Sequence, residues 1–171
     1  MNIFILDDNI EHCAIYHCDK HVVKMTLETA QLLCSPFEQG DAPYRRTHYN
    51  HPCAKWVRKS AGNYEWLLEL GYRLAHEYTH RYKKIHKCLD VIDWCDNNYH
   101  SLNLPDLGLT QWAQAMPDEY KSSCAIDAYR KYYCEDKREF CTWTNRDIPN
   151  WWPYAEVVEL VDTTDLKSVG L

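Results

Sequence analysis

Five polar side chains near the N-terminus recur at the spacing of an α-helix. They are His17, His21, Lys24, Glu28 and Gln31. At 100° per residue they fall within an arc of roughly 80° on one helix face. Apolar side chains flank this arc on both sides, which predicts a helix that packs on two sides and lines a cleft. Histidine, lysine and glutamate perform acid–base chemistry and bind anions, so this polar stripe is a candidate active site. An ordinary solvent-exposed strip is the alternative.

Charge is unevenly distributed along the chain. The 171 residues carry a net charge of −6, which argues against a generic nucleic-acid-binding protein. Residues 45–87, however, contain ten lysines and arginines against three acidic residues, a net charge of +7 that leaves −13 for the remainder. This block predicts a face that contacts a phosphate-bearing partner, with a solvated helix as the alternative. The candidate phosphate-binding residues are His48, His51, Arg58, Asn63, Arg81, His86 and Lys87.

The composition predicts an all-α fold. Only 5 glycines occur and few segments alternate as strands do, so we expect a compact single-domain helical bundle with a short extended N-terminal arm. Helices are expected at residues 10–34, 52–83, 87–98 and 117–142. The second has an apolar seam at alternating spacings of four and three, which predicts the longest helix without a break.

We expect the domain to comprise residues 1–154, and residues 155–171 to form a disordered tail. The chain has 9 cysteines, an odd number, and no two of them form a C-x-x-C pair. Both features favour reduced thiols over disulfides or a zinc ribbon. The sequence shows neither a secretory signal nor a membrane span, so a cytoplasmic protein without membrane contact is expected.

A possible zinc motif, H-E-x-x-H, lies at residues 76–80. On a helix, His76 and His80 are one turn apart and could share a zinc ion, with Glu77 polarising its water. A zinc hydrolase is therefore one alternative. The charge of Arg81 directly after the motif and the missing third ligand argue against it, and we expect neither a metal nor another cofactor.

Several blocks of sequence resemble a family of small, mostly uncharacterised tailed-phage proteins. They are CDKHVVKM at residues 18–25, NHP at 50–52 and AMPDEYK at 115–121. This resemblance implies a phage protein that acts in the cytoplasm of an infected bacterial host.

A shorter block is similar to the first helix of phage pyrimidine-dimer DNA glycosylases. It comprises residues 19–23 followed by Glu28. Those enzymes are small and all-helical; their N-terminal amine attacks the deoxyribose C1′, and a glutamate on this helix drives the glycosylase and lyase steps. The resemblance implies that Glu28 is that glutamate. Two tryptophans at 151–152, followed by Tyr154, are similar to the aromatic C-terminal end of the family.

The chain departs from that family at three points. Asn2 is bulky enough to retain Met1, so the nucleophile is expected to be the Met1 amine, or Lys24 in its place. Leu27 stands where the family has an arginine, and the chain is acidic overall, whereas those enzymes are basic.

The sequence therefore favours an enzyme that acts on the N-glycosidic bond of a nucleotide or a damaged DNA base. The expected catalytic residues are Glu28, Lys24, His21, His17 and Met1. An alternative is a pocket protein that binds or degrades a free nucleotide, such as a host defence signal. The expected partner is DNA or a phosphate-bearing small nucleotide, and the oligomeric state stays open.

Overall fold

A computed structural model describes residues 1–153 of the protein. Within these residues the secondary structure is entirely helical, which confirms the predicted all-α class. The expected tail at residues 155–171, and Tyr154, lie outside the described residues. None of the helices in the described part is both long and apolar enough to cross a membrane.

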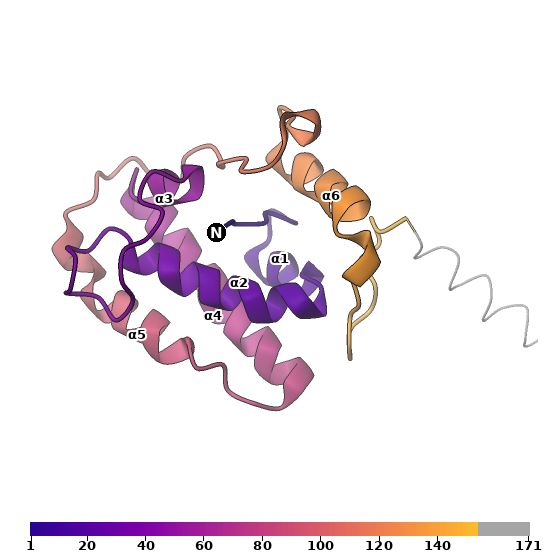
Figure 1. Cartoon of the computed structure of the whole chain (residues 1–171), viewed down its shortest axis with the longest axis horizontal. Coiled ribbons are helices and arrows are strands. Elements are labelled where there is room, and N and C mark those ends of the chain that lie inside the picture. Colours follow the sequence, from indigo (N-terminus) through magenta and orange to yellow (C-terminus); the bar gives the residue numbers. More distant parts are fainter. Residues whose placement is uncertain (154–171) are drawn as a thin grey trace, which may run out of the picture.

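Six α-helices and three short 3₁₀ turns make up residues 1–153 (Figure 1). The helices are α1 (Ile10–Tyr16), α2 (Asp19–Cys34), α3 (Pro52–Val57), α4 (Ala61–Tyr82), α5 (Leu89–Asn98) and α6 (Ala125–Asp136). The 3₁₀ turns are Tyr99–Leu102, Asp118–Tyr120 and Arg138–Phe140. The helix expected at 117–142 is thus shorter than predicted.

The helices pack around α2 and α4. Helix α2 contacts α3, α4 and α5, and α1 packs against α4. The N-terminal arm is extended, as predicted, but it is buried rather than peripheral, because Ile3, Phe4, Ile5 and Leu6 all lie in the core. The arm therefore places the start of the chain beside α2 and α3 (Figure 1).

The helix predicted at residues 10–34 is broken into two. His17 and Cys18 have extended backbone, with ψ angles of 133° and 163°. Contacts distant in sequence stabilise the break, because the Cys18 amide donates to the Tyr133 hydroxyl at 3.3 Å. The Asp19 amide likewise donates to the Thr142 carbonyl at 2.8 Å.

The helix predicted at residues 52–83 is also broken, between α3 and α4. Ser60 caps α4 by accepting a hydrogen bond from the Asn63 amide. The Asn63 side chain donates to the Trp56 carbonyl at 2.7 Å and to the Thr110 hydroxyl at 2.8 Å. The seam continues through α4, whose 22 residues make it the longest helix described.

All nine cysteines are free, in agreement with the expected reduced thiols. Six of them are buried among apolar side chains: Cys13, Cys18, Cys34, Cys53, Cys88 and Cys95. They pack as small hydrophobic residues.

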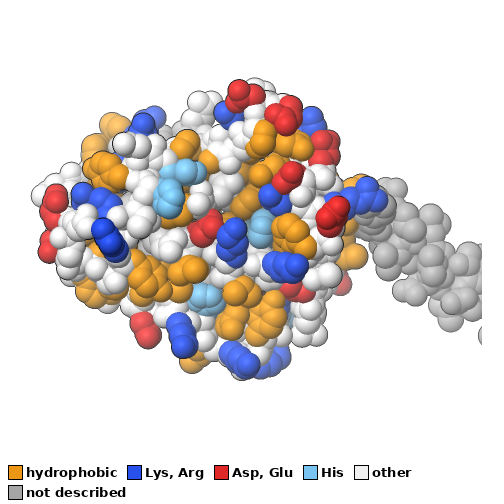
Figure 2. Space-filling view, in the orientation of Figure 1, with side chains coloured by type: hydrophobic (Ala, Val, Ile, Leu, Met, Phe, Trp, Pro, Cys, Tyr) orange, Lys and Arg blue, Asp and Glu red, His pale blue; other side chains and the backbone are white. Residues whose placement is uncertain are grey.

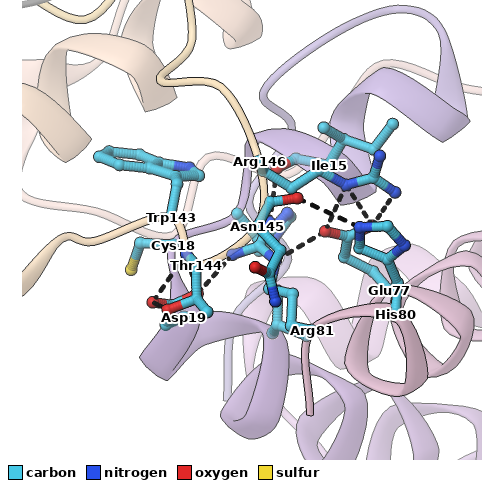
Figure 3. A network of polar contacts seen from close by, with 12 residues as sticks. Ile15, Cys18, Asp19, Glu77, His80, Arg81, Trp143, Thr144, Asn145 and Arg146 are labelled. Carbon is cyan, nitrogen blue, oxygen red and sulfur yellow. Dashed lines mark hydrogen bonds and ion pairs between the residues drawn. The ribbon is translucent and has the colours of Figure 1, made fainter. Parts of the chain in front are cut away.

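A buried ion network joins α2 to α4 and to the segment after α6 (Figure 3). Arg81 donates to Asp19 at 2.9 Å and to Glu77 at 2.6 Å. Arg146 donates to the second Glu77 oxygen at 2.7 Å, and the Thr144 amide and hydroxyl donate to Asp19. Asp19, at the start of α2, is therefore a buried residue of the fold.

The network keeps both carboxylates ionised. Burial alone would raise the pKa of Asp19, but hydrogen bonds from Arg81 and Thr144 outweigh burial and lower it. Burial would likewise raise the pKa of Glu77. Hydrogen bonds from Arg146 and Arg81 outweigh burial, so this pKa is also lowered. A charge that loses its partner here would be left uncompensated in the interior.

We expect Arg81→Met to lower the free energy of unfolding by about 3–5 kcal/mol, because two buried carboxylates lose their cation. Urea unfolding monitored by circular dichroism measures this loss. The matched control is Arg73→Met, since Arg73 pairs with Glu69 at 2.6 Å but is 42% exposed. That variant should lose far less stability, because water screens an exposed ion pair. Equal losses would show that burial of the network adds nothing.

Candidate active site

A cavity of about 180 Å³ lies where the N-terminal arm, α2 and α6 meet. It is lined by Met1, Asn2, Phe4, His21, Lys24, Met25, Glu28, Tyr132 and Lys137. Figure 2 shows this face of the molecule, where acidic and basic side chains lie next to each other near the N-terminus. Three members of the polar stripe, His21, Lys24 and Glu28, thus share one cavity with the start of the chain.

Glu28 is the carboxylate of this cavity and has three nitrogen neighbours. The Asn2 amide donates to its Oε2 at 2.7 Å, and the Met1 amine lies 3.9 Å from the same oxygen. Lys24 Nζ lies 3.7 Å from Oε1, one turn earlier on α2. The Glu28 side chain is only 12% exposed, whereas that of Lys24 is 65% exposed. A shielded carboxylate therefore faces a primary amine across a small open cavity.

His21 lies in the cavity wall as a neutral hydrogen-bonding group. Its Nδ1 is 2.6 Å from the Tyr133 hydroxyl, and Phe4 packs on its ring at 4.7 Å. Burial is the main cause that lowers its pKa to about 3. His21 is therefore uncharged at neutral pH.

His17 does not belong to the stripe, because the helix breaks at this residue. Its side chain is fully buried, and Nδ1 lies 2.7 Å from the Cys13 carbonyl oxygen. Nε2 has no hydrogen-bond partner among the described residues. Burial lowers the pKa of His17 to about 4. Its place outside the cavity argues against the predicted catalytic role. Gln31 does not line the cavity either.

His48 and His51 lie just before α3, and neither lines the cavity. His51 caps α3, with Nδ1 accepting from the Cys53 amide at 3.2 Å. Burial, and then the charges of the N-terminal amine and of His48, lower the pKa of His51, while Glu28 raises it. His51 is therefore close enough to the amine and to Glu28 to sense both charges.

The other candidate phosphate ligands do not gather at the cavity. Arg58 stacks on the Tyr49 ring at 3.6 Å and donates to its carbonyl. Arg81 and Asn63 are buried, and their donors bind partners within the fold. These positions argue against the predicted phosphate contacts of Arg81 and Asn63. His86 Nε2 lies 3.2 Å from the Val23 carbonyl oxygen, and the adjacent Lys87 is exposed.

Several arginines of the basic block at 45–87 therefore bind groups of the fold, and the predicted phosphate-binding face stays a prediction. Besides Arg58 and Arg81, Arg46 donates to the Ser35 and Phe37 carbonyls at the end of α2. Arginines of this block largely serve packing and capping.

The H-E-x-x-H segment does not fit a zinc hydrolase. Glu77 is only 3% exposed and is held by Arg81 and Arg146, so it is not placed to polarise a water. His80 lies against the Asn145 carbonyl at 3.1 Å. No group of three potential ligands suited to a metal occurs in the described residues.

Five residues of the cavity wall were not predicted as site residues: Asn2, Phe4, Met25, Tyr132 and Lys137. The last two lie farthest from the others in sequence. Both belong to α6 or its end, and Lys137 Nζ lies 4.7 Å from the centre of the Tyr132 ring. More than a hundred residues separate them from Glu28, and the density of tyrosines in α6 was the only signal for their role.

The two buried histidines predict that the protein loses stability in mild acid. The unfolded chain binds a proton on each histidine as the pH falls below about 6.5, whereas the folded chain does so only near pH 4 or 3. Their contribution is fully present above pH 6.5 and should fall by roughly 2 kcal/mol per histidine at pH 5.

Urea unfolding at a series of pH values from 7.5 to 5 measures this loss, above the range in which Asp19 and Glu77 titrate. His21→Gln should remove about half of the pH dependence. The matched control is His12→Gln, since the His12 side chain is 57% exposed. Constant stability across this range would contradict neutral burial of the two histidines.

The comparison with known families agrees with this geometry. The family model described as pyrimidine dimer DNA glycosylase matches residues 1–90, more than half of the chain. The match includes the N-terminal arm, Lys24 and Glu28, whereas α6 lies beyond it. No curated protein and no solved structure matches the chain, and the resemblance to tailed-phage proteins stays a prediction. The chain belongs to the pyrimidine dimer DNA glycosylase family.

Proposed function

We propose that the protein is a DNA glycosylase that cleaves the N-glycosidic bond of a damaged pyrimidine, with Glu28 and the N-terminal amine at the reacting carbon. One observation carries this proposal. The Glu28 carboxylate lies 3.9 Å from the Met1 amine and 2.7 Å from the Asn2 amide nitrogen, within the cavity. Family membership supplies the class of substrate.

The arrangement suits the chemistry of glycosidic cleavage. Positive charge develops on the deoxyribose as the bond to the base breaks, and a nearby carboxylate stabilises this charge. The amine, once deprotonated, forms a bond to C1′, while the glycosidic electron pair leaves with the base. An α-amine loses its proton more readily than a lysine side chain, which favours the chain terminus over Lys24 as the nucleophile. Lys24 then balances the charge of Glu28.

The size of the cavity suggests how DNA is placed. About 180 Å³ is small beside the roughly 300–1,000 Å³ of pockets that enclose a whole ligand. We assign the cavity to one deoxyribose and place the damaged bases outside it. The nucleotide must be displaced from the duplex for C1′ to reach the amine. Tyr132 is placed to stack on a base, and Lys24 and Lys137 to contact flanking phosphates.

The histidines at the start of α3 fit the same arrangement. His48 and His51 precede α3, which lies on the other side of the N-terminus from α6 in Figure 1, and we assign them contacts with the strand beyond the reacting sugar. A phosphate contact of His86 or of Lys87 is proposed from the sequence alone.

Replacing Glu28 tests the proposal. We expect Glu28→Gln to lower glycosylase turnover on ultraviolet-irradiated duplex DNA by roughly 100-fold or more, because the charge is lost while an acceptor for the Asn2 amide remains. The melting temperature should change little.

Glu38→Gln is the matched control for Glu28→Gln. The Glu38 side chain is 86% exposed and pairs with Arg46 at 3.8 Å. The activity of the Glu38→Gln variant should therefore equal that of the unmodified protein. Equal turnover of both variants at equal melting temperature would refute the role of Glu28.

A further inference from the structure

The side chain of Asn2 is held by partners from separate parts of the chain. Its Oδ1 accepts from the Tyr129 hydroxyl at 3.0 Å and from the amide of Ile3 at 2.8 Å. The Cys53 thiol lies 3.6 Å from the same oxygen. Its Nδ2 donates to the Ala115 carbonyl at 3.0 Å. Each polar atom of this amide thus has a partner, so its orientation is fixed.

Tyr129 of α6 is the centre of this arrangement. Its side chain is fully buried, and its hydroxyl accepts from the Ala115 amide at 3.1 Å. The hydroxyl proton is shared between Asn2 Oδ1 and the Ala113 carbonyl, at 3.0 and 2.9 Å. Burial raises the pKa of Tyr129 well above its usual range, so the hydroxyl remains a donor.

The residue held in this way is also the one whose backbone contacts Glu28. The Asn2 amide lies 2.7 Å from Glu28 Oε2, and the Met1 amine is the next nitrogen along the chain. We propose that Asn2 and Tyr129 are positioning residues that fix the N-terminal amine against Glu28. This inference rests on the proposed function. Misplacement of a reacting group by about 1 Å can cost roughly 100-fold in rate.

The inference assigns a role to the part of the chain beyond the family match. Ala113, Ala115 and Tyr129 all follow residue 90, where the match ends. The loop before α6 and α6 itself therefore complete a site whose reacting groups come from the first 28 residues. Together with the cavity wall residues Tyr132 and Lys137, they make the α6 region part of the active site.

The test uses Tyr129→Phe in the full chain, which keeps the ring and removes the hydroxyl. We expect kcat on ultraviolet-irradiated duplex DNA to fall about 10-fold or more, with KM unchanged, because DNA contacts are intact while the amine is no longer fixed. A second variant, Asn2→Gln, retains a bulky second residue and an amide but displaces the amide from Tyr129. It should show the same loss of kcat at an unchanged melting temperature.

Tyr64→Phe is the matched control. Tyr64 is also fully buried, and its hydroxyl donates to the Leu33 carbonyl at 3.0 Å, between α4 and α2. This variant should lose stability as Tyr129→Phe does but keep kcat within about twofold of the unmodified protein.

Two outcomes separate this inference from the proposed function. Wild-type kcat in Asn2→Gln, or equal kcat in Tyr129→Phe and Tyr64→Phe, would overturn the positioning role while leaving an inactive Glu28→Gln in place. An active Glu28→Gln would instead remove the proposed function on which the inference rests.

Discussion

The contact between Glu28 and the first two residues of the chain is the constraint on which the site depends. A carboxylate that is nearly excluded from water requires donors or cations close by. Here the Asn2 amide, the Met1 amine and Lys24 meet this requirement from two elements. The buried arm keeps the Met1 and Asn2 nitrogens in place, since residues 3–6 are anchored in the core. A shift of the arm would therefore alter both the packing and the site.

Helix α2 connects this site to the ion network at its other end. Asp19 in its first turn is tied to Arg81 and Thr144, and Glu28 follows more than two turns later. Because Arg81 and Arg146 share Glu77, the network also fixes α4 and the segment after α6. The network therefore sets the position of α2, and His21, Lys24 and Glu28 of the same helix face the cavity. Stability and chemistry depend on different residues of the same helix.

Helical periodicity predicted the fold class and the meeting of His21, Lys24 and Glu28, because both follow from local spacing. It failed where contacts distant in sequence decide the local structure. The Tyr133 hydroxyl stabilises the break at Cys18 and so removes His17 from the stripe. Charge counting could not separate basic side chains that face solvent from those such as Arg46 and Arg81, which bind carbonyls and carboxylates of the fold. The contact of Asn2 with Tyr129 has no local signal at all.

Covalent trapping tests the central claim most directly. An amine that attacks C1′ and opens the sugar leaves an imine, which sodium borohydride reduces to a stable cross-link between protein and DNA. The protein is incubated with duplex DNA that carries a pyrimidine dimer, reduced, digested and mapped by peptide mass spectrometry. The account predicts that the cross-link lies on the α-amine of the N-terminal residue. A cross-link on Lys24 or on another lysine, or cleavage of the glycosidic bond without any cross-link, would contradict it.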